Sequence, residues 1–360
     1  MAGEGTGAAA APVADGAGRS GATSPCDPFP EAALRAAAWL ETMRGPDGYG
    51  GPVVHWWQSC LRFTGAGLDW RYEGITHGML TLFERTGDDR WLTLARQACG
   101  DLVRGQLPDG RYRNSSFELN PYDGGTPHEA ACDVALLRLA HVLRGRGDPE
   151  WERYAGTARR NLSGYYLGRL WDADARAFRD DPRTPSFVPN KSATLSEALF
   201  LLASLDGHDE VVVRYALPTL RRVLAHQRGG GRLDGAIAQN SLRGRTVDTY
   251  FPFYVARCVG GLLEAHSRTG EGRWLDAACR AMGFVLRQRL DDGSFPQVVY
   301  GNGRANRYPR WIAGTGDVLR AARLLAPFGL HADLAGTEAL LLRGQTPAGG
   351  FRTADGFGSQ

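Results

Sequence analysis

Lysine is almost absent from this chain. Lys191 is the only lysine among 42 basic residues in a sequence of 360. The formal net charge is only +3 and the basic residues form no run, so the sequence does not favour a nucleic-acid-binding surface. Because arginine stands at nearly every other basic position, a lone lysine directly before an expected helix predicts a site that needs a compact ammonium group.

Paired cysteine motifs are also missing. The six cysteines show no C-x-x-C spacing, and Cys99, Cys132, Cys258 and Cys279 fall within helical patterns. They are interpreted as small buried thiols, and we expect no metal site. The chain also carries no P-loop and no dinucleotide-binding fingerprint, so we expect no cofactor.

Long apolar runs are absent. No stretch approaches the roughly 20 apolar residues of a membrane span. The first 28 residues, rich in Ala, Gly, Ser and Pro, lack the apolar core of a signal peptide. We therefore expect residues 1–28 to form a disordered tail, residues 29–360 to form one catalytic domain, and the protein to be cytoplasmic.

An internal repeat dominates what the sequence does contain. The stretch 85–112, RTGDDRWLTLARQACGDLVRGQLPDGRY, returns at 268–295 as RTGEGRWLDAACRAMGFVLRQRLDDGSF. In both copies an Arg-Thr-Gly is expected to end one helix, and a Gln followed by an Asp-Gly turn is expected to close the next. The turn recurs with steps of 62, 65, 60, 58 and 56 residues, at Asp47, Asp109, Asp174, Asp234, Asp292 and Ala348. A period near 60 residues accommodates two helices and their loops.

Hydrophobic periodicity predicts an alternation of helices with long and tight connections. The connections that hold the Asp-Gly turn span about 14 to 22 residues, which is typical of functional loops. If alternate helices form an inner and an outer ring, all long loops lie on one face and the inner helices point their N-termini toward it. Ser192 and Thr194, and separately Asp248, are candidate caps of two inner helices. The eleven expected helices cover 30–43, 73–84, 90–105, 128–144, 150–169, 192–205, 209–227, 248–266, 272–289, 313–326 and 331–343.

This pattern resembles the (α/α)6 toroid superfamily. The resemblance covers the chain after residue 28, with eleven helices where twelve complete the ring, and it implies an all-α fold. Two branches are similar: the six-hairpin glycosidases with polysaccharide lyases and sugar epimerases, and the terpenoid cyclases with prenyltransferases. The turns at Gln106, Gln288 and Gln345 fit both branches. The Asp-x-Asp-Asp acid and the aspartate-rich magnesium motif of the cyclases are missing, as is the Cys-His-Gly string of lanthionine-forming toroids.

Carboxylates near the long loops are candidate acids and bases, because glycoside chemistry needs one of each across the sugar. Asp123 is the first choice, since its loop gives it no capping role. Glu73, one turn after Asp69 at the start of a helix, and Asp248 come next. Asp317 lies early in the tenth helix. No spacing rule selects the pair.

Cations and aromatic rings in the same loops are candidate binding residues. Inner-helix N-termini favour an anion, and sugars or carbocations can lie against aromatic faces. His77 and His128 stand at helix starts and are candidate acids or bases. Each of these residues also has a purely structural interpretation. The residues expected to bind substrate are Lys191, Trp56, Trp57, Trp70, Tyr250, Trp311, His128 and Arg310.

We therefore expect a carbohydrate-active enzyme, of glycoside hydrolase, lyase or epimerase type, that acts on an acidic sugar or oligosaccharide by general acid and base catalysis. The alternative is an unusual terpenoid cyclase or prenyltransferase acting on an isoprenoid diphosphate. Polarity at the centre of the ring separates the two, because a sugar site needs convergent polar side chains and a hydrocarbon site needs almost none.

Overall fold

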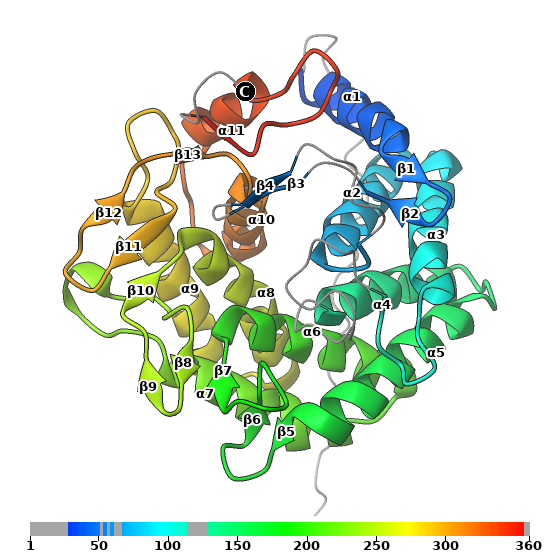
Figure 1. The fold of residues 1–360 in the computed structure, drawn as a ribbon, viewed down its shortest axis with the longest axis horizontal. Coiled ribbons are helices and arrows are strands. Elements are labelled where there is room, and N and C mark those ends of the chain that lie inside the picture. The colour runs from blue at the N-terminus through cyan, green and yellow to red at the C-terminus, as the bar shows by residue number, and fades with distance from the viewer. Residues whose placement is uncertain (1–27, 51–52, 56–57, 61–66, 114–128, 356–360) are drawn as a thin grey trace, which may run out of the picture.

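A computed structural model describes residues 28–50, 53–55, 58–60, 67–113 and 129–355. Within these ranges the chain forms eleven α-helices in two concentric layers, as Figure 1 shows. Five inner helices surround the centre: α2 (Trp70–Thr86), α4 (Glu129–Gly145), α6 (Pro189–Asp206), α8 (Pro252–Thr269) and α10 (Thr315–Leu325). Six outer helices enclose them: α1 (Pro28–Thr42), α3 (Asp89–Arg104), α5 (Trp151–Asn161), α7 (Leu217–Ala225), α9 (Gly272–Arg287) and α11 (Ala335–Arg343). The predicted all-α (α/α)6 toroid, one helix short, is confirmed.

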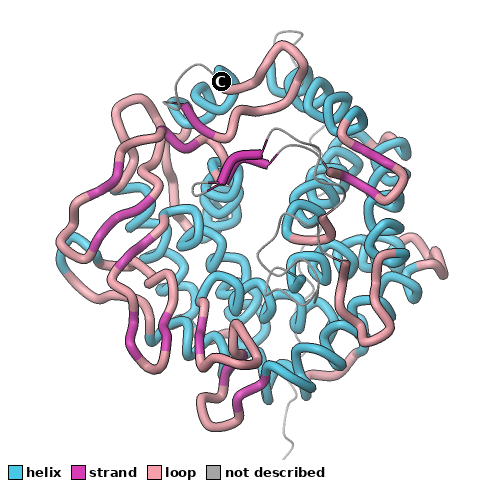
Figure 2. The backbone as a smooth tube through the Cα atoms, viewed as in Figure 1, coloured by secondary structure: helices cyan, strands magenta, loops and turns pink. Residues whose placement is uncertain are grey.

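Short strands occupy the connections that lead from outer to inner helices (Figure 2). They form two- and three-stranded antiparallel sheets, of which β10, β11 and β12 make one and β7, β8 and β9 another. The long connections therefore share one face with the inner-helix N-termini. The strands are β1 (Arg44–Gly45), β2 (Gly48–Tyr49), β3 (Val53–His55), β4 (Gln58–Cys60), β5 (Trp171–Asp172), β6 (Ala177–Phe178), β7 (Ser186–Phe187), β8 (Ser241–Leu242), β9 (Arg245–Thr246), β10 (Thr249–Tyr250), β11 (Val298–Tyr300), β12 (Ala305–Asn306), β13 (Arg310–Trp311) and β14 (Ala354–Asp355).

The helix ends confirm part of the expected pattern and correct the rest. Gly87 and Gly270 end α2 and α8 in the left-handed conformation, as the Arg-Thr-Gly motif predicts. The prediction that Ser192 and Thr194 cap α6 is wrong, because this helix begins at Pro189, where proline needs no hydrogen-bond acceptor. Asp248 does not cap α8 either, since that helix begins at Pro252.

The Asp-Gly turns do not close the helices before them. Four of them join an outer helix to the next one, through Gly110, Gly235, Gly293 and Gly349. Gly235, at φ +83°, lies against the carbonyl oxygen of Arg280 so closely that a Cβ at this position would stand 1.9 Å from it. In the same way, Gly110 lies against the carbonyl oxygen of Arg160 in α5, and Gly349 lies against that of Arg35 in α1. Only glycine combines this conformation with this approach.

Glutamine side chains complete the same joint. Gln106 Nε2 donates to Thr157 O at 2.8 Å, and Gln345 Nε2 donates to Ala32 O at 2.8 Å. The second bond links α11 to α1 and closes the outer ring. In the repeat before α11 the equivalent position is Arg289, which donates to Asp333 O. Gln288 is the C-cap residue of α9, as the sequence predicts.

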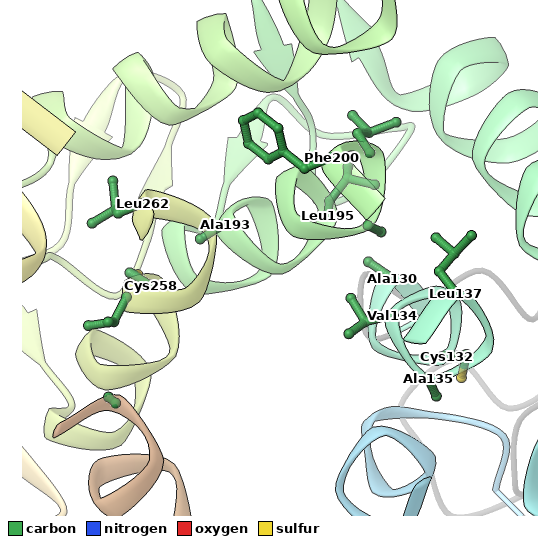
Figure 3. Close-up of a cluster of buried hydrophobic side chains, with 14 of the residues drawn as sticks. Ala130, Cys132, Val134, Ala135, Leu137, Ala193, Leu195, Phe200, Cys258 and Leu262 are labelled. Atoms are coloured by element: carbon green, nitrogen blue, oxygen red, sulfur yellow. The ribbon is translucent and has the colours of Figure 1, made fainter. Parts of the chain in front are cut away.

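The core lies between the two layers and between neighbouring inner helices. Figure 3 shows buried residues of α4, α6 and α8 as parts of one cluster. The backbones of α6 and α8 approach closely, because a Cβ at Gly261 would stand 2.5 Å from Ala193 O. Cys99, Cys132 and Cys258 are buried free thiols and Cys279 is half-buried, as expected. None of the described helices is both long and apolar enough to span a bilayer.

Candidate functional site

The centre of the ring is filled by charged side chains. Glu73, in the first turn of α2, is 3% exposed and its two oxygens face two arginines. One oxygen pairs with Arg257 of α8, and the other lies 3.2 Å from Nη1 of Arg320 in α10. Among the described residues no inner helix lies between α10 and α2, so the pair of Glu73 with Arg320 joins these two helices directly.

The chain of charges extends to the remaining inner helices. Arg320 also lies 3.4 Å from Glu197 of α6, which in turn pairs with Arg138 of α4. On the other side, Arg257 Nη1 lies 3.0 Å from Asp317 Oδ1 of α10. We call these six residues the central network: Glu73, Arg138, Glu197, Arg257, Asp317 and Arg320.

Local sequence explains how buried charges fit here. Gly260 of α8 leaves room for the Glu197 carboxylate, since a Cβ at that position would stand 2.6 Å from Glu197 Oε2. The pairing matters because burying an unpaired ion is costly. The open space that remains inside the network is only about 20 Å³, so the network forms a polar floor beneath the inner-helix N-termini.

The carboxyl groups at this floor have divergent pKa values. Burial alone would raise the pKa of Glu197, but Arg138 and Arg320 lower it to about 2. Burial raises the pKa of Asp317; Arg257 opposes the shift, and the charge of Glu73 adds to it. Burial and the charge of Glu197 also raise the pKa of Glu264, on the same face of α8. The floor therefore combines a carboxylate of low pKa, Glu197, with two carboxyl groups that bind a proton more readily, which is the pattern of an acid and its charge-stabilising partner.

His77, one turn beyond Glu73, adds a neutral group. Burial and the charges of Arg320 and Arg138 lower its pKa to about 4, against the opposing charges of Glu73 and Glu197. His77 is therefore a neutral imidazole at pH 7, able to donate or accept a hydrogen bond.

The structure disperses the other predicted site residues. Asp248 is exposed and accepts a hydrogen bond of 2.6 Å from Tyr250, whose ring is buried against Phe284. Tyr250 therefore offers no free face to a sugar. Lys191 Nζ lies 3.1 Å from Asp180 Oδ1.

The remaining predicted binding residues lie at the rim or outside the described ranges. Trp70, at the first position of α2, is 46% exposed. Arg310 pairs with Asp292 at 3.0 Å, and Trp311 of β13 is half-buried. Four predicted residues fall outside the described ranges: Asp123, Trp56, Trp57 and His128.

The sequence carried a signal for the central network that the search for loop carboxylates missed. Arg138, Glu197 and Arg257 each interrupt a mainly apolar stretch of an inner helix, in LLRLAHVL, TLSEALFL and YVARCVGG. A lone charge in such a helix has to find a partner inside the protein. Across the described ranges no three His, Cys, Asp or Glu side chains are arranged as metal ligands.

Comparison with solved structures finds the same architecture in several enzymes. An α-1,6-mannanase, GH76A of Salegentibacter sp. HEL1_6, matches with a TM-score of 0.63 at 17% identity, over 90% of this chain and 91% of that one. The chain has the six-hairpin glycosidase fold. No protein-family model and no curated protein matches the sequence.

Two further six-hairpin structures match over comparable lengths. The unsaturated glucuronyl hydrolase of Bacillus sp. GL1 has a TM-score of 0.66 at 14% identity, covering 90% of this chain and 87% of that one. A D-mannose isomerase has a TM-score of 0.67 at 13% identity, covering 91% and 89%. Proteins with this ring thus include hydrolases and an isomerase, so the fold alone does not fix the reaction.

Proposed function

We propose that this protein is a carbohydrate-active enzyme that binds a sugar above the central network and acts on it by general acid and base catalysis. The observation that carries the proposal is the convergence of ionisable side chains from all five inner helices on the floor of the ring. A sugar needs such convergent polar groups, whereas the isoprenoid alternative needs an apolar cavity that can hold a carbocation. The similar solved structures are sugar-processing enzymes, and one inactive mannanase variant holds α-1,6-mannotriose.

Within the described ranges, Asp317 is our candidate proton donor. Burial raises its pKa, so it binds a proton more readily than an exposed aspartate does. Its half-buried side chain lies at the start of α10, on the face where the long loops gather. Glu73 stands across Arg257 from it as a buried anion that can stabilise positive charge developing on the sugar. Asp123 and Asp248 remain predicted acids or bases from the sequence.

The acidic nature of the sugar is the finer part of the proposal. Helix N-termini around the mouth favour an anionic group, but each arginine of the central network already faces a carboxylate. The carboxylate of a uronate therefore has to be bound by groups near the inner-helix N-termini or in the long loops rather than by the central network.

The test is product analysis by proton NMR with α-1,6-mannotriose, an unsaturated glucuronyl disaccharide and free mannose. New reducing ends indicate hydrolysis, and a changed monosaccharide indicates isomerisation or epimerisation. We expect turnover of at least one sugar and a loss of about 100-fold or more in kcat for Asp317→Asn. The matched control, Asp333→Asn at the start of the outer helix α11, should keep its turnover. An unchanged rate in Asp317→Asn would remove this residue from the mechanism, and stabilisation by prenyl diphosphates alone would favour the isoprenoid alternative.

A further inference from the structure

A second hollow lies between the turn after α7 and the hairpin of β11 and β12. Its volume is about 490 Å³, far more than the space left inside the central network. Both connections belong to the long-loop face, since they lead into the inner helices α8 and α10. None of its lining residues belongs to the central network. We call it the rim cleft; Ala225–Leu233 contributes its lining on one side, with Gly231 as the exception, and Thr246 and Gly301–Gly303 on the other.

The charge of the rim cleft is wholly positive. Arg228 and Arg232 line it, no carboxylate does, and neither arginine has an ion-pair partner among the described residues. His226 adds no charge there, because burial lowers its pKa and both ring nitrogens are engaged, one with Arg222 O at 2.9 Å and the other with Ser241 Oγ at 3.0 Å. The arginines of the central network, in contrast, all face carboxylates.

Backbone groups add further donors. Gly229 and Asn302 line the cleft, and within the described ranges their N–H groups have no hydrogen-bond acceptor. Glycines at the rim also keep the space open: Gly230 and Gly303 have φ angles of +77° and +79°, which disfavour any larger residue. The lining of the cleft is therefore rich in donors and contains no acidic side chain. Two carboxylates lie beside the lining: Asp234 Oδ1 accepts a hydrogen bond from Gly230 N at 2.8 Å, and Asp248 packs against Gly301.

The size of the cleft favours a sugar unit over a small free ion. About 490 Å³ falls in the range of pockets that bury a small organic ligand. Tyr300, which precedes the lining residue Gly301 in the same hairpin, is 43% exposed.

The geometry points to the rim cleft as a subsite for the carboxylate or sulfate group of an acidic glycan, with Arg228 and Arg232 as its ligands. This inference rests on the proposed function only in taking a sugar chain as the ligand. The acidic unit bound at the rim is distinct from the unit that meets the floor of the ring. The enzyme then selects glycans by a charge that lies away from the reacting bond.

Isothermal titration calorimetry with tetragalacturonate, α-1,6-mannotetraose and inorganic sulfate tests this subsite. We expect the wild-type protein to bind tetragalacturonate more tightly than the neutral tetrasaccharide, with an affinity that falls as salt is added. The double variant Arg228→Ala/Arg232→Ala should bind tetragalacturonate about tenfold more weakly, while Arg228→Lys/Arg232→Lys should retain part of the affinity. Arg221→Ala, on the exposed side of α7 and outside the cleft, is the matched control. All variants are checked for an unchanged thermal midpoint.

The outcomes separate this inference from the proposed function. If the double variant binds tetragalacturonate as tightly as the wild type, the subsite is refuted, whatever the protein does to mannotriose. If sulfate binds as well as tetragalacturonate and displaces it, the cleft is a simple anion site and the glycan assignment is overturned. If the arginines prove necessary for tetragalacturonate while no sugar is turned over, the subsite holds and the catalytic proposal fails.

Discussion

The outer and inner rings are held together by different interactions. The outer helices are joined by a repeated local device, in which a turn glycine and a Gln or Arg side chain contact the next outer helix. The inner helices are joined by ion pairs between residues as far apart in sequence as Glu73 and Arg320. The outer device recurs after α3, α7, α9 and α11, with Arg289 in place of Gln after α9. The inner network occurs once and gives the ring a specific polar floor.

The largest difference should appear between an arginine of the central network and a surface arginine that pairs α10 with the outer helix α11. Arg257→Ala removes the cation between Glu73 and Asp317 and leaves Glu73 buried with one partner fewer, so we expect a loss of about 3–5 kcal/mol in the free energy of unfolding. Arg323→Ala removes an exposed pair with Glu338 on the periphery, and about 0–1 kcal/mol is expected. Urea unfolding of both variants measures the contrast. Equal losses would show that the central network has no special energetic role.

The turn glycines allow a matched test of the outer joint. Gly235 and Gly207 both have positive φ angles, +83° and +77°, but only Gly235 faces a neighbouring carbonyl, whereas nothing lies within 4 Å of a Cβ at Gly207. Gly207→Ala should cost about 1–2 kcal/mol from backbone strain. Gly235→Ala should cost about 3 kcal/mol or more, because it also separates α7 from α9. If the two variants unfold at the same urea concentration, the contact does not hold the joint.

Acid should weaken the inner ring through His77. Its pKa of about 4 in the folded chain lies below the value of about 6.5 in an unfolded chain. Between these pH values the unfolded chain binds the proton and the folded chain does not, so stability is complete above pH 6.5 and falls toward pH 4. We expect His77→Gln to remove about 2 kcal/mol of this decline. His141 and His226, whose pKa values burial also lowers, supply part of the remainder. An unchanged pH profile of unfolding in His77→Gln would contradict this assignment.

The smallest effect should come from the glutamine that closes the outer ring. Gln345→Ala removes the hydrogen bonds to Ala32 O and Gly349 O, and about 1 kcal/mol is expected. Gln227→Ala removes the equivalent pair, to Gly235 O and Ala277 O, inside the ring. If closure between α11 and α1 is simply one more repeat, the two variants lose the same stability. A much larger loss for Gln345→Ala would mean that the closing joint differs from the others.

The sequence predicted the ring because its period, its helices and its turn glycines are local features. It did not predict the equivalence of Arg289 with Gln106, since a guanidinium and an amide can donate to the same carbonyl without any likeness in sequence. The central network escaped prediction for a different reason. Glu73 was a candidate from its position at a helix start, but its partners come from α8 and α10, and no sequence spacing relates them.

The most direct test of the proposed function is a crystal structure of Asp317→Asn soaked with whichever sugar the wild-type enzyme turns over. We expect a sugar unit above the central network, with its reacting oxygen or carbon beside residue 317 and Arg257. An acidic glycan should in addition extend toward Arg228 and Arg232. A sugar bound only on the outer surface, with no sugar in contact with the central network, would contradict the proposal.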